Sequence, residues 1–124
     1  MNPKHECKKL INSFKYAFTG IESAFKSERN MKIHVTAMVL VIILGLALKI
    51  SVSEWIACFF CFAIVISGEL FNTAIEITVN LAMPKKNEAA KRAKDIAAGG
   101  VLVCAIFSAF IGIWIFLPKI IELF

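Results

Sequence analysis

The pattern of apolar and polar positions divides the chain into one amphipathic segment followed by three long apolar ones. Residues 7–30 carry aromatic and aliphatic side chains on one helical face and lysines on the opposite face. This pattern predicts a helix that lies at a membrane surface. Residues 33–50, 54–83 and 94–118 are predominantly apolar, and a membrane-crossing helix needs about 20 such residues. We therefore expect an all-α integral membrane protein with a single domain over residues 1–124.

Local signals predict where these helices begin and end. Ser51 to Glu54 is expected to form a tight turn in which Ser51 caps the following helix. Pro84 should end that helix, and the last apolar segment is expected to end at Pro118. Small side chains recur every four residues in the last segment and predict close helix packing there: Gly100, Cys104, Ser108 and Gly112.

Composition and charge strengthen the membrane interpretation and give an orientation. Hydrophobic residues make up 59% of the chain, too many for a soluble domain of this size. The net charge is +5, and most lysines and arginines lie before residue 33 or within residues 82–95. By the positive-inside rule both basic stretches are cytoplasmic. Three crossings then leave the N-terminus cytoplasmic and the C-terminus outside. We expect no nucleic-acid partner.

The second apolar segment carries an unusual polar face. At 100° per residue, five polar side chains fall within one arc of about 100°. Ionised side chains are costly inside a bilayer, at roughly 2.5 kcal/mol or more, and those that occur usually serve a function. A polar seam between helices would account for one amide or hydroxyl group, but it fits poorly with two carboxylates. We therefore interpret this face as a functional site, formed by Glu69, Asn72, Thr73, Glu76 and Asn80.

Further charged residues converge on the cytoplasmic end of this face. Glu28 ends the amphipathic segment and should place a third carboxylate at the same depth. Lys94 and Asp95 begin the last apolar segment, and Lys85, Lys86 and Asn87 lie shortly before them. Clustered carboxylates at a wet boundary suit Mg²⁺, and lysines suit phosphate groups. Together these residues predict phosphoryl transfer.

Three helices cannot enclose a face that carries two glutamates, because each helix keeps a side exposed to lipid. Self-association or partner helices must therefore cover the site. A symmetric homo-oligomer is the simpler solution.

The stretch from Glu69 to Glu76, Glu-Leu-Phe-Asn-Thr-Ala-Ile-Glu, followed by Ala93-Lys94-Asp95, resembles the signature of the small bacterial diacylglycerol kinase family. Within that family, Ser27–Asn30 with His34 and Ile115–Lys119 resemble the undecaprenol kinase branch of Gram-positive bacteria. The resemblance covers nearly the whole chain. It implies a surface helix, three crossings and a homotrimer in the bacterial cell membrane, with ATP and a membrane lipid as substrates and Mg²⁺ as cofactor.

The resemblance also implies a role for each matching residue. Glu69 would be the general base that binds the lipid hydroxyl, and Asn72 would help to orient it. Glu28 and Glu76 would hold Mg²⁺ and contact the nucleotide phosphates. The remaining nucleotide contacts would be Tyr16, Lys85, Lys86, Asn87, Lys94 and Asp95.

Two alternatives stay open on the residues alone. Undecaprenol and diacylglycerol are both neutral alcohols at the same membrane depth, so the residue chemistry does not distinguish them. A small oligomeric proton-coupled transporter could use Glu69 as its ion site. A transporter function would not explain the presence of Glu28, Glu76 and the Lys94–Asp95 pair.

Overall fold

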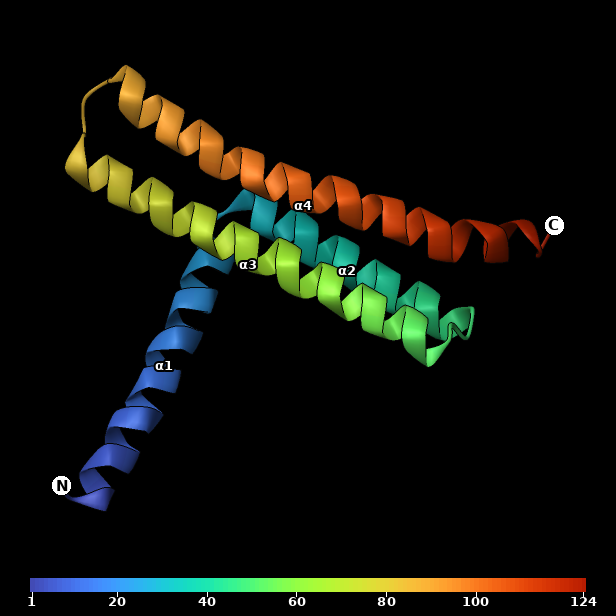
Figure 1. Cartoon of the computed structure of the whole chain (residues 1–124), viewed down its shortest axis with the longest axis horizontal. Coiled ribbons are helices and arrows are strands. Elements are labelled where there is room, and N and C mark those ends of the chain that lie inside the picture. The colour runs from blue at the N-terminus through green and yellow to red at the C-terminus, as the bar shows by residue number, and fades with distance from the viewer.

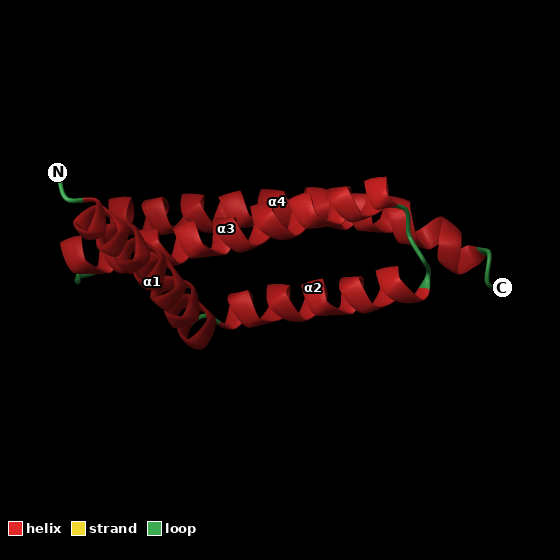
Figure 2. Ribbon diagram, turned by 90° about the horizontal axis from the view of Figure 1, so that it is seen from below, coloured by secondary structure: helices red, strands yellow, loops and turns green.

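The computed structural model describes residues 1–124 and consists of four helices and no strand. In chain order they are α1 (Pro3–Ser27), α2 (Arg29–Ala47), α3 (Val52–Ala82) and α4 (Glu88–Ile121). Helices α3 and α4 run antiparallel and side by side, α2 lies beside this pair, and α1 leaves the bundle at a steep angle (Figures 1 and 2). Helices α2, α3 and α4 are long and apolar enough to cross a membrane. The all-α prediction is confirmed, and the chain has the predicted number of helices able to span a membrane.

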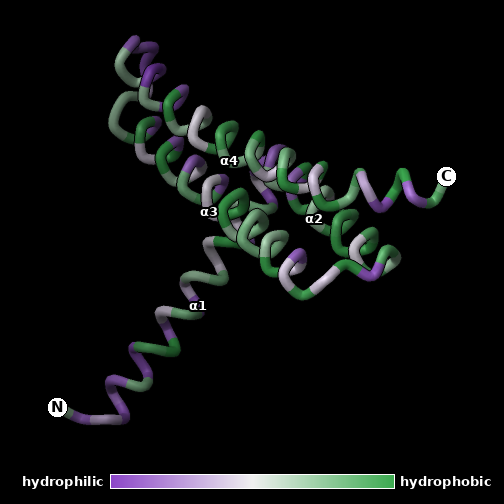
Figure 3. The backbone as a smooth tube through the Cα atoms, turned by 45° about the vertical axis from the view of Figure 1, so that its right-hand side comes forward, coloured by the Kyte–Doolittle hydropathy of each residue, from purple (hydrophilic) through white to green (hydrophobic).

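The bundle has two ends, which differ in polarity. The turn end carries the short α2–α3 connection at residues 48–51, and the loop end carries the α3–α4 connection at residues 83–87. Figure 3 shows hydrophilic residues at the loop end and alternating along α1, whereas the middle of the bundle is mostly hydrophobic. The loop end therefore matches the basic stretch that the sequence assigned to the cytoplasm.

Capping interactions explain several helix ends. Ser51 and Glu54 form the expected cap, because the Ser51 hydroxyl accepts from the Glu54 N–H and the Glu54 carboxylate accepts from the Ser51 N–H. Helix α2 ends with the Ile50 N–H donating to the Gly45 carbonyl and with Lys49 at a φ of 51°, the left-handed conformation that closes many helices. Helix α3 stops at Ala82, two residues before Pro84, as predicted.

Several helix bounds differ from the bounds of the predicted segments. Helix α1 begins at Pro3 rather than residue 7, because Asn2 caps it and proline is favoured in a first turn. Helices α2 and α4 begin at Arg29 and Glu88 rather than at residues 33 and 94. Apolar composition marks only the lipid-facing part of a helix, and the helix itself continues into charged residues. Helix α4 also runs through Pro118 to Ile121.

Few side chains are buried within the chain. Ten of the 124 residues are buried, and the small apolar core lies at the turn end, around Ile50, Cys58 and Phe116. Nearer the middle, a mainly apolar cavity of about 310 Å³ separates α2 from α3 and α4. Ser108 and Gly112 line this cavity, and a methyl group added at Gly112 would meet nothing within 4 Å. The C-terminal half of the predicted ridge, at Ser108 and Gly112, therefore faces this cavity, and no helix packs closely against Gly112.

Candidate functional site

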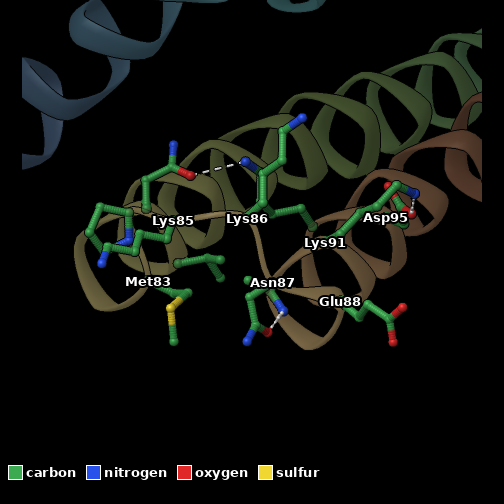
Figure 4. Close-up of a pocket in the computed structure, with 12 residues that line it drawn as sticks. Met83, Lys85, Lys86, Asn87, Glu88, Lys91 and Asp95 are labelled. Carbon is green, nitrogen blue, oxygen red and sulfur yellow. Dashed lines mark hydrogen bonds and ion pairs between the residues drawn. The ribbon is translucent and has the colours of Figure 1, made fainter.

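The predicted phosphate-binding residues gather in a groove at the loop end. This groove, of about 620 Å³, lies between the last turns of α3 and the first turns of α4 (Figure 4). Four lysines line it, and we call it the lysine groove. Of the residues assigned to the nucleotide, five line this groove: Lys85, Lys86, Asn87, Lys94 and Asp95. An open, basic groove of this kind suits a phosphate-bearing ligand.

The lysines of the groove are held differently. Lys94 donates to the Asn80 side-chain oxygen across 3.0 Å, which joins α4 to α3. Lys91 is paired with Asp95 one turn further along α4. Lys85 and Lys86 make no hydrogen bond or ion pair, and both are exposed on the connecting loop. Asn87 caps α4, since its Oδ1 accepts from the Ala90 N–H at 3.0 Å. The groove thus combines two lysines that have side-chain partners with two that have none and lie on the connecting loop.

Glu69 lies deeper in the bundle, on the predicted polar face of α3. Its side chain is only 2% exposed, and its Oε1 lies 3.1 Å from Nε2 of His34 on α2. Thr73, one turn further along the same face, is also buried. The Thr73 hydroxyl is the one buried side-chain polar atom without a hydrogen-bond partner. The polar face of α3 is therefore turned toward the other helices at Glu69 and Thr73.

The antiparallel register of α2 and α3 places Glu28 and Glu76 on the loop-end side of the His34–Glu69 contact. His34 contacts Glu69, so the two helices are in register at that point. Glu28 directly precedes α2, six residues before His34, and Glu76 follows Glu69 by seven residues of α3, a rise of about 10.5 Å. Both glutamates are half-buried. Glu28 is also the single non-helical residue between α1 and α2, so its position is set by two helix ends.

The chain offers Mg²⁺ separate carboxylates rather than a closed cage of ligands. No three His, Cys, Asp or Glu side chains come together in the chain, as an all-protein metal cage would require. Mg²⁺ in phosphate-transferring enzymes takes one or two carboxylates and completes its shell with phosphate oxygens and water. Glu28 and Glu76 could supply two carboxylates of this kind.

The other two predicted site residues differ in their surroundings. Asn72 is half-buried on α3, one turn from Glu69. Tyr16 lies on α1, is 73% exposed and does not line the lysine groove. The structure thus brings the lysine-groove residues together. Glu69, Asn72 and Glu76 lie along one helix, α3. Tyr16 lies near neither group.

Two side chains at these sites received no role from the sequence. His34 is the only titratable residue between Lys32 and Lys49, and this isolation in an apolar segment was the signal that could have singled it out. Asn80 was recognised as part of the polar face, but its contact with Lys94 joins residues 14 positions apart on two helices. No helical periodicity reveals such a contact.

Comparison with known proteins shows the family of the chain. The sequence profile of the prokaryotic diacylglycerol kinases matches residues 15–116. The chain is 42% identical over 117 residues to the undecaprenol kinase of Bacillus subtilis, which covers 94% of this chain and 95% of that protein. It is 36% identical over 115 residues to a diacylglycerol kinase of Synechocystis sp., covering 92% of this chain and 66% of that protein. A diacylglycerol kinase of Haemophilus influenzae is 32% identical over 94 residues, or 76% of this chain and 80% of that protein. The chain therefore belongs to the prokaryotic diacylglycerol kinase family.

Proposed function

We propose that this protein is a membrane lipid kinase that transfers the terminal phosphoryl group of ATP to undecaprenol, giving undecaprenyl phosphate and ADP. The observation that carries the proposal is the position of Glu69. This carboxylate is buried in a membrane-spanning helix whose loop end borders a basic groove. A lipid alcohol reaches such a carboxylate from the bilayer, and a nucleotide reaches such a groove from water.

Glu69 is proposed as the general base. It removes the proton from the lipid hydroxyl while the oxygen attacks the terminal phosphorus of ATP, so that an O–P bond forms and the bond to ADP breaks. A positioned base typically contributes about 10²–10⁴-fold to such a step. Asn72, one helical turn away, is proposed to orient the hydroxyl.

Glu28 and Glu76 are proposed to hold Mg²⁺, which when bound neutralises negative charge on the nucleotide phosphates. Both residues lie toward the loop end from the His34–Glu69 contact, on the side of the lysine groove, and this supports the proposal. Lys94 and Asp95 are proposed to contact the nucleotide, together with Lys85, Lys86 and Asn87. Tyr16 remains a weaker proposal, because it is exposed on α1 away from the groove.

The proposed setting is a bacterial cell membrane with the loop end, and so the N-terminus, facing the cytoplasm. Helix α1 would lie in the headgroup plane, and its exposed Phe14, Phe18 and Phe25 support this placement. We also propose a homotrimer, in which neighbouring copies cover the half-buried polar residues that a single chain leaves accessible.

Undecaprenol is preferred over diacylglycerol because the undecaprenol kinase of Bacillus subtilis matches nearly the full length of both chains at 42% identity. The name of the Synechocystis relative supports diacylglycerol as the second candidate. Both alcohols carry a neutral hydroxyl at the same depth, so Glu69 would serve either one.

A competition assay decides between the two lipids. Purified protein is placed in one bilayer preparation that holds both alcohols in equal amounts, and labelled ATP is added. We expect more label in undecaprenyl phosphate than in phosphatidic acid, which reports the ratio of the two kcat/KM values. Equal or greater label in phosphatidic acid would assign the chain to diacylglycerol, and no label in either lipid would reject a lipid kinase acting on these two alcohols.

A further inference from the structure

The contact between His34 and Glu69 is the only contact between a basic and an acidic side chain that joins α2 to α3. His34 Nε2 lies 3.1 Å from Glu69 Oε1, and the histidine is 25% exposed while the glutamate is 2% exposed. Charged groups that are buried in proteins are normally paired, because desolvation disfavours them. His34 is the partner that Glu69 has in this chain.

The pairing occupies only one oxygen of the carboxylate. Oε1 faces His34, and the structure gives Oε2 no hydrogen-bond or ion-pair partner. A general base needs one oxygen free to accept a proton and gains from having the other held in place. The contact with α2 therefore leaves Glu69 in an arrangement that suits a base.

The Thr73 hydroxyl, one turn from Glu69 on the same face of α3, is a second and independent observation. The chain has four threonines, and three of them donate to the carbonyl four residues earlier. Thr73 is the exception, and its hydroxyl is buried without a partner. Buried polar atoms are rarely left unpaired, so an unpaired one calls for an explanation. A hydroxyl that docks beside Glu69 would supply the missing partner.

We infer that His34 is a positioning residue for Glu69: it fixes Oε1 and so leaves Oε2, with the Thr73 hydroxyl one turn away, to receive the lipid hydroxyl. The inference rests on the proposed role of Glu69 as general base. It adds that α2 contributes to the reaction through a single side chain. His34 does not touch the nucleotide in this arrangement, because the lysine groove lies beyond the start of α2.

The alternative is that the pair merely fastens α2 to α3. A fastening role predicts that loss of His34 lowers stability and the yield of folded protein. It does not predict a change in the turnover of the molecules that remain folded. The experiment must therefore separate turnover from stability and from nucleotide binding.

The first experiment compares His34→Ala, His34→Gln and a control, Val35→Ala, in bilayers with saturating lipid. Val35 is the next residue of α2 and is also partly buried. We expect His34→Ala to lower kcat by about 10- to 100-fold, the loss typical of partners that orient a functional side chain. The KM for ATP should not change. His34→Gln should recover part of the loss, because an amide N–H can also donate to Oε1. Wild-type kcat in His34→Ala would overturn the inference.

The second experiment combines His34→Ala with Glu69→Gln. If His34 acts through Glu69, its removal has no further effect once the carboxylate is gone, so the two losses are not additive. Equal factors in both backgrounds would show an independent role and overturn the inference. The single variants separate the two hypotheses. An inactive Glu69→Gln with a fully active His34→Ala defeats only the inference, whereas an active Glu69→Gln defeats the proposed base itself.

Discussion

The amine of Lys94 on α4 donates a hydrogen bond to Oδ1 of Asn80 on α3 across 3.0 Å. This contact holds a half-buried positive charge against the inner wall of the lysine groove, at the end of the polar face that begins with Glu69. Of the four lysines in the groove, it is the one tied to the helix that carries the proposed base. The relationship gives a direct test of where the nucleotide binds.

Lys94→Met should raise the KM for ATP by about tenfold or more, because a hydrogen bond to a charged group contributes about 1.5–3 kcal/mol. Asn80→Ala should have a smaller effect in the same direction, since it leaves the charge in place and removes only its anchor. The measurement is an ATP titration at saturating lipid. An unchanged KM for Lys94→Met would remove this lysine from the nucleotide site.

Glu69→Gln should preserve the fold and the oligomer while lowering kcat by about 10²–10⁴-fold, the usual contribution of a general base. Glutamine has nearly the same shape and cannot accept the proton. The assay follows labelled phosphate into lipid, and a mass measurement in mild detergent checks the assembly. Turnover near that of the wild type would exclude Glu69 as the base.

Glu76→Gln and Glu28→Gln should each raise the Mg²⁺ concentration needed for half-maximal activity. We expect at least about a tenfold rise, since even partners that only support metal ligands contribute about 10- to 100-fold to metal affinity. A Mg²⁺ titration at fixed lipid and ATP measures the effect. Glu22→Gln is the control, because Glu22 is an exposed carboxylate on α1 paired with Lys26. If all three variants share one Mg²⁺ dependence, the metal assignment is wrong.

The protein should assemble into a trimer. In mild detergent, after correction for bound detergent, the mass should be three times the 13.7 kDa of one chain. Cross-linking in native membranes should give the same number. A stable monomer with full activity would contradict the idea that neighbouring copies complete the site.

Gly45→Ala should destabilise the α2–α3 hairpin by about 1–3 kcal/mol, the range for overpacking a filled site. A Cβ at Gly45 would lie 2.7 Å from the Trp55 ring, which is too close. Gly20→Ala is the matched control, because nothing lies within 4 Å of a Cβ there. That change should stabilise α1 by about 0.5–1 kcal/mol. Thermal unfolding in one detergent compares the two, and equal shifts would contradict the packing argument.

The sequence predicted most accurately those features that depend on neighbouring residues. The Ser51–Glu54 cap and the end of α3 before Pro84 follow from local backbone chemistry, and both were found. The same kind of signal failed at Pro118, because a helix close to its natural end can lose one hydrogen bond and continue for another turn. Proline is therefore a weaker stop signal in a last turn than in the middle of a chain.

The sequence patterns did not predict the side-chain contacts between helices. The polar face of α3 was identified from its periodicity, but its partners depend on how α2 and α4 are aligned alongside it. His34 meets Glu69 across 35 positions, and Lys94 meets Asn80 across a loop. The spacing of hydrophobic residues predicts which face of a helix is buried. It does not predict how far one helix is shifted along its neighbour. The clustering of Lys85 to Asn87 with Lys94 follows more simply, because a short loop keeps them together.

The small number of buried residues has a consequence for how this protein must be handled. With only ten of 124 residues buried, most of the apolar surface that a soluble protein would hide inside is turned outward. Lipid or detergent, rather than a protein interior, then shields most of the apolar side chains from water. Bilayer thickness and the choice of detergent therefore affect the structure of this protein, as amino-acid substitutions do. A measured stability or turnover number is thus a property of the chain together with its lipid, and comparisons between variants hold only when that environment is kept identical.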